Sequence, residues 1–328
     1  MPYHSNTAIT TGTPAFLVSL KDFLTGTVGW TLYDDGSADP YPYYVFRSFG
    51  ESGAEDLYLR FQNDSGTHRI SVEVYQYWNA TTHTGVNGAY YLNSTCVKTS
   101  DSAQFIYWFF ADLDHVFIVT KISSIYYGHY SGLVRRFWSD AVAVTQLAVS
   151  AGSNVVLPVN TALIFTVGES YQIKDNAGIE RVKVTAVNTD VTPNTVTVQT
   201  LTRGYTAGAK MGEDPQPVIN GHFYSPSTFY ALNRFDGYSS ANGHVGRCGA
   251  ANGGLQTDCD PDLRYGRTVL FPWLASINAS DCQELRGELI EVYSFGGGNT
   301  DSEDTLTVGG DTYLAFNLSS AGWCAVKV

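Results

Sequence analysis

The chain has 328 residues, of which 44% are apolar and 14% aromatic, and its formal charge is −12 at pH 7. This length exceeds one hydrophobic core and indicates two or three folding units, and the apolar share excludes a disordered chain. The negative charge disfavours a nucleic-acid-binding protein, because phosphate binding needs clustered Lys and Arg. The one basic pair of note, Arg135 and Arg136, is more typical of a solvated strand end or a partner salt bridge than of a DNA site.

The N-terminal segment lacks the charged start and apolar run of a secretion signal, so we expect the protein to be made and retained in a cytoplasm. No membrane span is predicted, because the most apolar stretch, 105–122, is interrupted by Asp112, Asp114 and His115. Five cysteines show no C-x-x-C spacing and therefore no zinc signature. Cys248 and Cys259 bracket a loop rich in Gly and Asn, and both a disulfide and two thiols are open for this pair.

The first predicted element is a helix. Phe16, Leu17, Leu20, Phe23 and Leu24 recur at helical spacing. Thr13 with Pro14 is typical of an N-cap and first turn, and Gly26 is the predicted end.

From residue 30 the apolar pattern has a period of two. Leu57, Leu59 and Phe61 alternate with other residues, and after a turn at 63–66 the alternation resumes with Ile70, Val72 and Val74, which predicts a hairpin. The stretches 105–110 and 116–122 form a second predicted pair. These are more continuously apolar, which indicates a position in the centre of a sandwich.

Between residues 147 and 209 aromatic residues become rare and Thr, Val and Asn dominate. Strands are predicted at 155–159, 171–174, 179–187 and 194–201, and about 60 residues in five short strands suit a small closed barrel. Aromatic residues return after 217, which predicts that the chain re-enters the first domain. The predicted fold is mainly β: a β-sandwich with one N-terminal helix over 1–146 and 210–328, interrupted by a small inserted β-barrel over 147–209.

Three elements are predicted near the C-terminus. Ser280 and Gln283 have capping-box spacing and Gly287 follows, which predicts a short helix over 281–286. The segments 305–308 and 312–316, joined by Gly309 and Gly310, predict a hairpin. A last strand is expected over 323–328.

Three stretches resemble structural proteins of tailed bacteriophage virions. They are Phe-Arg-Ser-Phe-Gly-Glu-Ser-Gly at 46–53 with its continuation to 60, the inserted unit with Val-Val-Leu-Pro-Val at 155–159 and Tyr-Thr-Ala-Gly-Ala-Lys-Met-Gly at 205–212, and Thr-Val-Gly-Gly-Asp-Thr-Tyr-Leu at 307–314. The resemblance implies a non-enzymatic minor structural protein of the tail, at the baseplate or neck, assembled in the host cytoplasm. Its partners would be other virion proteins and copies of itself in a symmetric assembly. The loop 248–262 matches no pattern of these proteins.

Carboxylates group at four places, and a close pair of them is the apparatus of glycoside hydrolysis. Each group falls in a turn rich in Gly, Pro or Ser, where Asp is favoured for its backbone hydrogen bonds, so the turn interpretation is preferred. The group of Asp258, Asp260 and Asp262 also suits Ca²⁺, but it lacks a complete EF-hand loop. The groups are Asp34, Asp35 and Asp39; Asp112 and Asp114; Asp301, Glu303 and Asp304; and Asp258, Asp260 and Asp262.

Seven scattered histidines, among them His115 and His129 beside aromatic residues, have no zinc spacing and are expected to pack or hydrogen-bond. No catalytic, cofactor-binding or metal-binding residue is therefore predicted, and no nucleic-acid or membrane contact is expected.

The many tyrosines leave a binding role open. Core packing, a subunit interface and contact with a host glycan are all compatible with the two Tyr-rich runs. The alternative functions are therefore a receptor-binding or fibre-like adhesin and, third, a glycan-degrading enzyme. The runs hold Tyr41, Tyr43 and Tyr44, and Tyr126, Tyr127 and Tyr130.

Overall fold

The fold is mainly β, as predicted, with one N-terminal helix, a β-sandwich, and a small β-barrel inserted in the sequence of the sandwich. Two compact units can be distinguished: Met1–Phe137, Pro217–Leu232 and Gly237–Val328 form the first, and Trp138–Gln216 with Asn233–Asp236 forms the second. The predicted insertion, 147–209, lies within the second unit. The computed structural model describes residues 3–10, 12–51, 57–64, 69–89, 96–100, 104–136, 142–175, 177–212, 218–223, 228–232, 239–247, 270–279, 282–295, 300–318 and 322–328.

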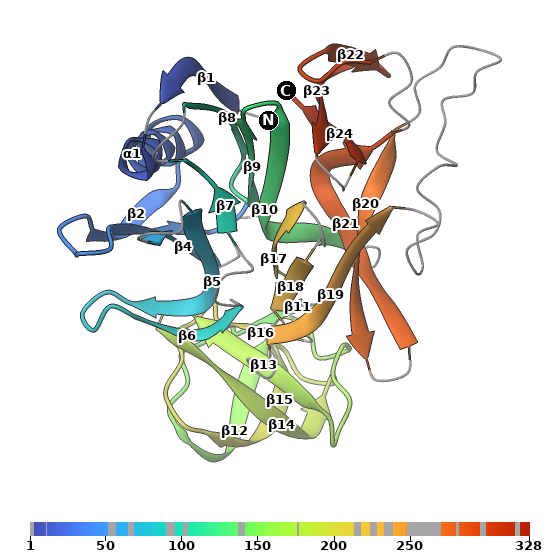
Figure 1. The fold of residues 1–328 in the computed structure, drawn as a ribbon. Helices are drawn as coiled ribbons and strands as arrows, with labels where there is room; N and C mark the ends of the chain where they lie inside the picture. The colour runs from blue at the N-terminus through green and yellow to red at the C-terminus, as the bar shows by residue number, and fades with distance from the viewer. Residues whose placement is uncertain are drawn as a thin grey trace. The chain divides into compact units, whose positions relative to one another are not determined.

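The first unit contains a long antiparallel sheet (Figure 1). Strand β21 pairs with β10 as well as with β20 and β24. The six strands from β10 to β21, in the sheet order given next, therefore form a closed ring. The order is β1 (Tyr3–Thr10), β8 (Phe105–Ala111), β9 (His115–Ile122), β10 (Ile125–Arg136), β17 (Val218–Phe223), β18 (Thr228–Leu232), β19 (Ser239–Arg247), β20 (Phe271–Ala279), β21 (Cys282–Ser294), β24 (Gly322–Lys327), β23 (Asp311–Leu318) and β22 (Thr305–Val308).

The second sheet of this unit contains the first predicted hairpin. Phe61 lies opposite Val72 and Leu59 opposite Val74, so the predicted alternation is confirmed. The other face is also buried, because Tyr58 and Tyr75 pack with Trp78 in a core of their own. The strands are β2 (Thr31–Gly36), β3 (Tyr43–Ser48), β4 (Leu57–Asp64), β5 (Arg69–Asn79) and β6 (Thr84–Ala89) in this order, with β7 (Cys96–Lys98) paired to β5.

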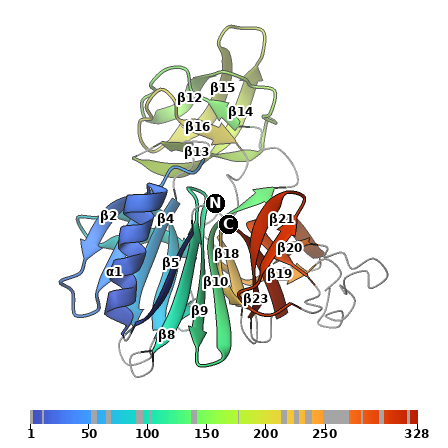
Figure 2. The same cartoon turned by 90° about the horizontal axis from the view of Figure 1, so that it is seen from above.

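Helix α1 (Thr13–Phe23) contacts β3 and β4, and Figure 2 shows it beside β4. Its predicted apolar face is confirmed, and the five residues of that face are buried against both sheets. Pro14 lies in the first turn, as predicted, but the predicted N-cap at Thr13 and the predicted end at Gly26 are wrong. Gly12 occupies the N-cap position without a side-chain cap, and the hydroxyl of Thr13 instead bonds that of Thr99. The helix continues past Gly26 as a π-helical turn, η1 (Leu24–Val28), and ends at Gly29, whose positive φ of 97° suits glycine.

The β8–β9 pair is central, as its continuous apolar pattern predicts. Tyr107 and Phe109 pack with α1 on one face. On the other face, Trp108 and Phe110 pack with Phe316 of β23. Both faces of the hairpin are therefore buried. Because neither face is solvated, its apolar residues do not alternate with polar ones.

The second unit is the small barrel. Its sheet closes through a bridge between Thr145 and Val159, supported by a hydrogen bond from the Gln146 N–H to the Pro158 carbonyl. The core is aliphatic, with Leu157, Ile173 and Val196 among its buried members. The strand order is β11 (Val142–Val144), β16 (Lys210–Gly212), β13 (Ser170–Asp175), β14 (Gly178–Asn188), β15 (Asn194–Leu201) and β12 (Gly152–Val159).

The predicted helix over 281–286 is wrong, because Cys282 begins the long strand β21. Its first residues pair with the end of β20, Cys282 opposite Ala279 and Gln283 opposite Asn278. The capping-box spacing is a local signal, and strand pairing overrides it. The predicted C-terminal hairpin and last strand are confirmed as β22, β23 and β24. Among the described residues, no helix is long and apolar enough to cross a bilayer.

Candidate functional site

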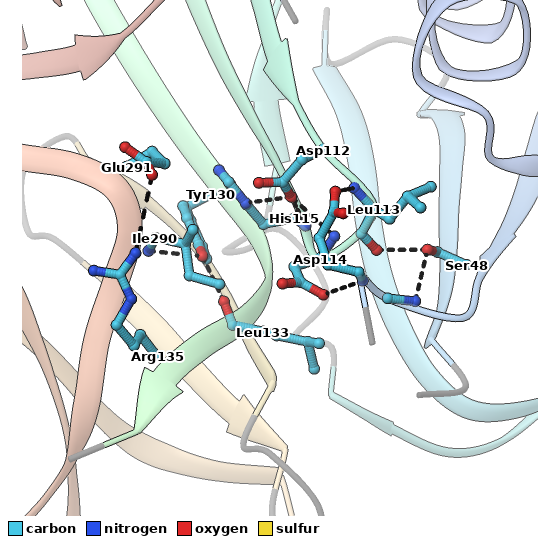
Figure 3. Close-up of polar contacts among 12 residues, drawn as sticks. Ser48, Asp112, Leu113, Asp114, His115, Tyr130, Leu133, Arg135, Ile290 and Glu291 are labelled. Carbon is cyan, nitrogen blue, oxygen red and sulfur yellow. Dashed lines mark hydrogen bonds and ion pairs between the residues drawn. The ribbon is translucent and has the colours of Figure 1, made fainter. Parts of the chain in front are cut away.

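The turn between β8 and β9 carries a network of polar contacts (Figure 3). Asp112 Oδ1 accepts the backbone N–H groups of Asp114, at 2.8 Å, and of His115, at 3.0 Å. This is the turn chemistry that the sequence predicts for the Asp112 and Asp114 pair. The carbonyl of Asp112 also accepts a 2.7 Å hydrogen bond from Trp30 Nε1.

The same turn is bound to the segment that follows β3. Ser48 donates its hydroxyl to the Leu113 carbonyl and accepts the Gly50 N–H. The Glu51 N–H donates to Asp114 Oδ1 at 2.8 Å (Figure 3). The turn therefore links the two sheets of the first unit through backbone groups and short side chains.

His115 lies at the centre of this link between the two sheets. Its Nδ1 lies 2.8 Å from Asp112 Oδ1, and its ring stacks on Tyr130 with 5.1 Å between centroids and 15° between planes. The Tyr130 hydroxyl donates to the Leu133 carbonyl and accepts the Ile290 N–H. Both rings are fully buried, so solvent has no access to either one in this conformation.

The pKa values of the two carboxyl groups in the turn, Asp112 and Asp114, are shifted in opposite directions. Burial by itself raises the pKa of Asp112, but the charge and hydrogen bond of His115 and the backbone donors outweigh it, so the pKa is lowered. Burial raises the pKa of Asp114, and it also raises the pKa of the Tyr130 hydroxyl well above its usual value. The site has the residue types of an acid–base pair, but its contacts are made within the protein and link the two sheets.

A second buried carboxylate lies in the β2–β6 sheet. Asp34 Oδ2 accepts Trp78 Nε1 at 2.7 Å and the Tyr43 hydroxyl at 3.4 Å, and it lies 2.8 Å from His83 Nδ1. The carboxylate of Asp34 accepts hydrogen bonds from side chains distant in the sequence, and no turn backbone donor is among these partners, so the turn interpretation is wrong for this residue.

The exposed neighbours of Asp34 do serve turns, as predicted. Asp35 accepts the Ser37 N–H and Asp39 accepts the Tyr41 N–H. The three acids of this group are therefore not brought together as a catalytic set.

The third acid group closes a turn and links it to the β9–β10 hairpin. Asp304 accepts the Asp301 N–H at 2.8 Å. Glu303 Oε1 accepts Lys121 Nζ at 2.7 Å and the Tyr126 hydroxyl at 2.6 Å. Burial raises the pKa of Glu303, but these two hydrogen bonds outweigh it and the pKa is lowered. Glu303 is therefore an anchoring residue.

The Tyr-rich runs are mainly core. Tyr43, Tyr44, Tyr126 and Tyr130 are all buried, and Tyr41 is exposed. The packing interpretation therefore holds for these four, and they form no exposed aromatic platform. Arg135, the first residue of the basic pair, lies 2.9 Å from a carboxylate oxygen of Glu288 in an ion pair.

The acids of the loop 248–262 lie outside the described residues, as do Cys248 and Cys259. In the part of the chain that the structure describes, no group of three or more His, Cys, Asp or Glu side chains is arranged to hold a metal ion.

The prediction that His129 packs or hydrogen-bonds is confirmed, but the sequence did not reveal the buried polar network to which it belongs. His129 Nε2 lies 3.0 Å from Asn220 Oδ1, Ser131 donates to the same oxygen at 2.8 Å, and Asn220 Nδ2 donates to the Val72 carbonyl. All three side chains are buried. The network couples β10 and β17 to β5, and only the polar residues inside apolar strands signal it.

No known protein family matches the chain, and no curated protein does.

Proposed function

We propose that this protein is a non-enzymatic structural component of a tailed bacteriophage virion, located in the tail at the baseplate or neck, and that it acts through contacts with other virion proteins. Sequence resemblance supports the virion assignment, on the stretches 46–60, 155–212 and 304–316. The fold supports a role as a rigid element, because each unit has its own core.

The observation that carries the proposed mode of action is the surface of the inserted barrel. Nine large hydrophobic residues of the described chain are exposed, and five of them belong to the second unit, although this unit is only about a quarter of the sequence. Leu163, one of the five, is 82% exposed. Exposed apolar side chains gathered on one module favour a protein-contact surface. The five residues are Leu147, Val156, Leu163, Val167 and Val191.

The carboxylates support the non-enzymatic part of the proposal. Asp34, Asp112 and Glu303 each accept hydrogen bonds from side chains or backbone groups of the protein itself. A glycoside hydrolase typically needs two acids that face a common substrate, and these three hold separate parts of the fold.

The test is the composition of particles of the phage that encodes the chain. Mass spectrometry of purified virions should find the chain in a fixed ratio to tail proteins, and antibody labelling should place it at the baseplate or neck. Virions without the chain would overturn the proposal. Release of reducing sugar from host-surface glycans by the purified protein would favour the glycan-degrading alternative.

A further inference from the structure

One outer face of the barrel has no ionisable side chain. It consists of two registered rows across β14, β15 and β12. The first row is Ala186, Thr197 and Val156, and the second is Asn188, Thr195 and Pro158. We call these six residues the uncharged face.

The side chains of the uncharged face point outward. Between its rows, Leu157 of β12 lies opposite Val196 of β15, and both are core residues of the barrel. Because side chains alternate along a strand, their neighbours face the other side. Val156 is 52% exposed.

Charges stand outside the uncharged face. In β14 it is preceded by Lys183 and followed, beyond the strand end, by Asp190. Exposed Leu147 belongs to the segment beside it, since the neighbouring Gln146 donates its N–H to the Pro158 carbonyl. The surface is thus small and uncharged, with three apolar residues beside two Thr and one Asn, and the absence of charge fits the charge-depleted centre of an interface.

The distribution of formal charge is uneven. The second unit contains eight acidic and six basic residues, a formal charge of −2, which leaves −10 of the total −12 on the first unit. Two copies of an acidic chain repel each other, and burying carboxylates between them adds a desolvation cost. Contact between copies is therefore least opposed at a surface without charges.

We propose that the uncharged face is the surface on which a second copy of this chain docks. The inference deepens the proposed function by naming a second copy as a partner, and it rests on that function in one respect, that the chain acts in an assembled particle. Threonine methyl and hydroxyl groups with Val and Pro side chains on a sheet supply contact area without charged side chains that would have to lose their hydration shell.

The size of the face sets the strength of the contact. A stable dimer needs about 800 Å² per partner, which exceeds what two rows on three strands provide. We therefore expect weak, reversible association in solution, strengthened in a particle by contacts made at the same time elsewhere. Because the net charges repel, added salt should strengthen the association by screening them.

The experiment is sedimentation equilibrium of the full chain up to about 0.5 mM, a range that detects dissociation constants near a millimolar. The wild type should associate, and association should increase with salt. Val156→Glu should weaken it by about tenfold or more, since it places a charge within the uncharged face. Thr197→Glu, on the neighbouring strand, should do the same.

The matched control is Val18→Glu on the exposed side of α1, which adds the same charge to the first unit and should leave association unchanged. Circular dichroism shows that each variant is folded. A wild type that stays monomeric, equal association of Val156→Glu and wild type, or equal loss in Val18→Glu would overturn the proposal. A different virion protein bound to this face would also overturn it. The proposed function fails separately, if virions lack the chain.

Discussion

Gly132 of β10 lies directly opposite His115 of β9, and a β-carbon on Gly132 would be 2.4 Å from the His115 α-carbon. Gly132 also has a φ of 146°, which side chains rarely adopt. The close approach of β10 to the backbone of His115, whose buried ring stacks on Tyr130, therefore requires a residue without a side chain at position 132. The absence of a side chain at position 132 thus makes room for the contacts by which the β8–β9 turn links the two sheets.

Gly132→Ala should destabilise the first unit by about 2–4 kcal/mol, because the backbone of β9 must move. Tryptophan fluorescence during urea unfolding measures the loss, since Trp30, Trp78, Trp108, Trp273 and Trp323 all belong to this unit. Gly26→Ala is the control, as nothing lies within 4 Å of the added carbon. Equal stability of the two variants would contradict this account of Gly132.

Asp112→Asn keeps an oxygen acceptor for the turn but removes the charge beside His115. The pKa of Asp112 is lowered in the folded protein, so its stabilisation is present above the unfolded value, about 3.9, and is lost as pH falls through the folded pKa. We expect a loss of about 1–3 kcal/mol at pH 7 and a difference from wild type that shrinks in acid. Urea midpoints from pH 7 to pH 3 measure it. A constant difference over this range would show that the charge is unimportant.

Asp34→Ala should remove the acceptor of Trp78 Nε1 and the partner of His83. A buried donor without a partner costs about 1–3 kcal/mol. Asp35→Ala removes only an exposed turn contact and should cost less than about 0.5 kcal/mol, the usual size for surface positions. Thermal unfolding of both variants tests the comparison, and a larger loss in Asp35→Ala would refute the assignment.

Patterns that report burial were predictable from sequence. The spacing of Phe16, Leu20 and Phe23 defines the buried face of α1, and alternation defines the β4–β5 hairpin. The ends of α1 were not predictable in the same way, because the π-helical turn to Gly29 follows from packing of the whole segment. The false helix at 281–286 arises because capping-box spacing cannot reveal that β20 is available as a strand partner.

Polar sites were predictable only where they are local. Asp112 and His115 are three residues apart, and the turn between two apolar strands already points to them. The partners of Asp34 are not local, since His83 is 49 residues away in the chain. A single sequence carries no sign of that pairing, and Asp34 therefore looks like its turn neighbours Asp35 and Asp39.

Asp114→Asn should respond to pH in the opposite sense to Asp112→Asn. Burial raises the pKa of Asp114, so ionising this carboxyl costs stability above the folded pKa, and the cost disappears as pH falls. The amide keeps an acceptor for the Glu51 N–H and cannot ionise. We expect the variant to gain stability relative to wild type at pH 7 and to lose this advantage near pH 4, measured by urea unfolding at both values. If it instead loses stability at pH 7 and recovers in acid, the carboxylate form is favoured by the fold, and burial does not dominate the electrostatics of this turn.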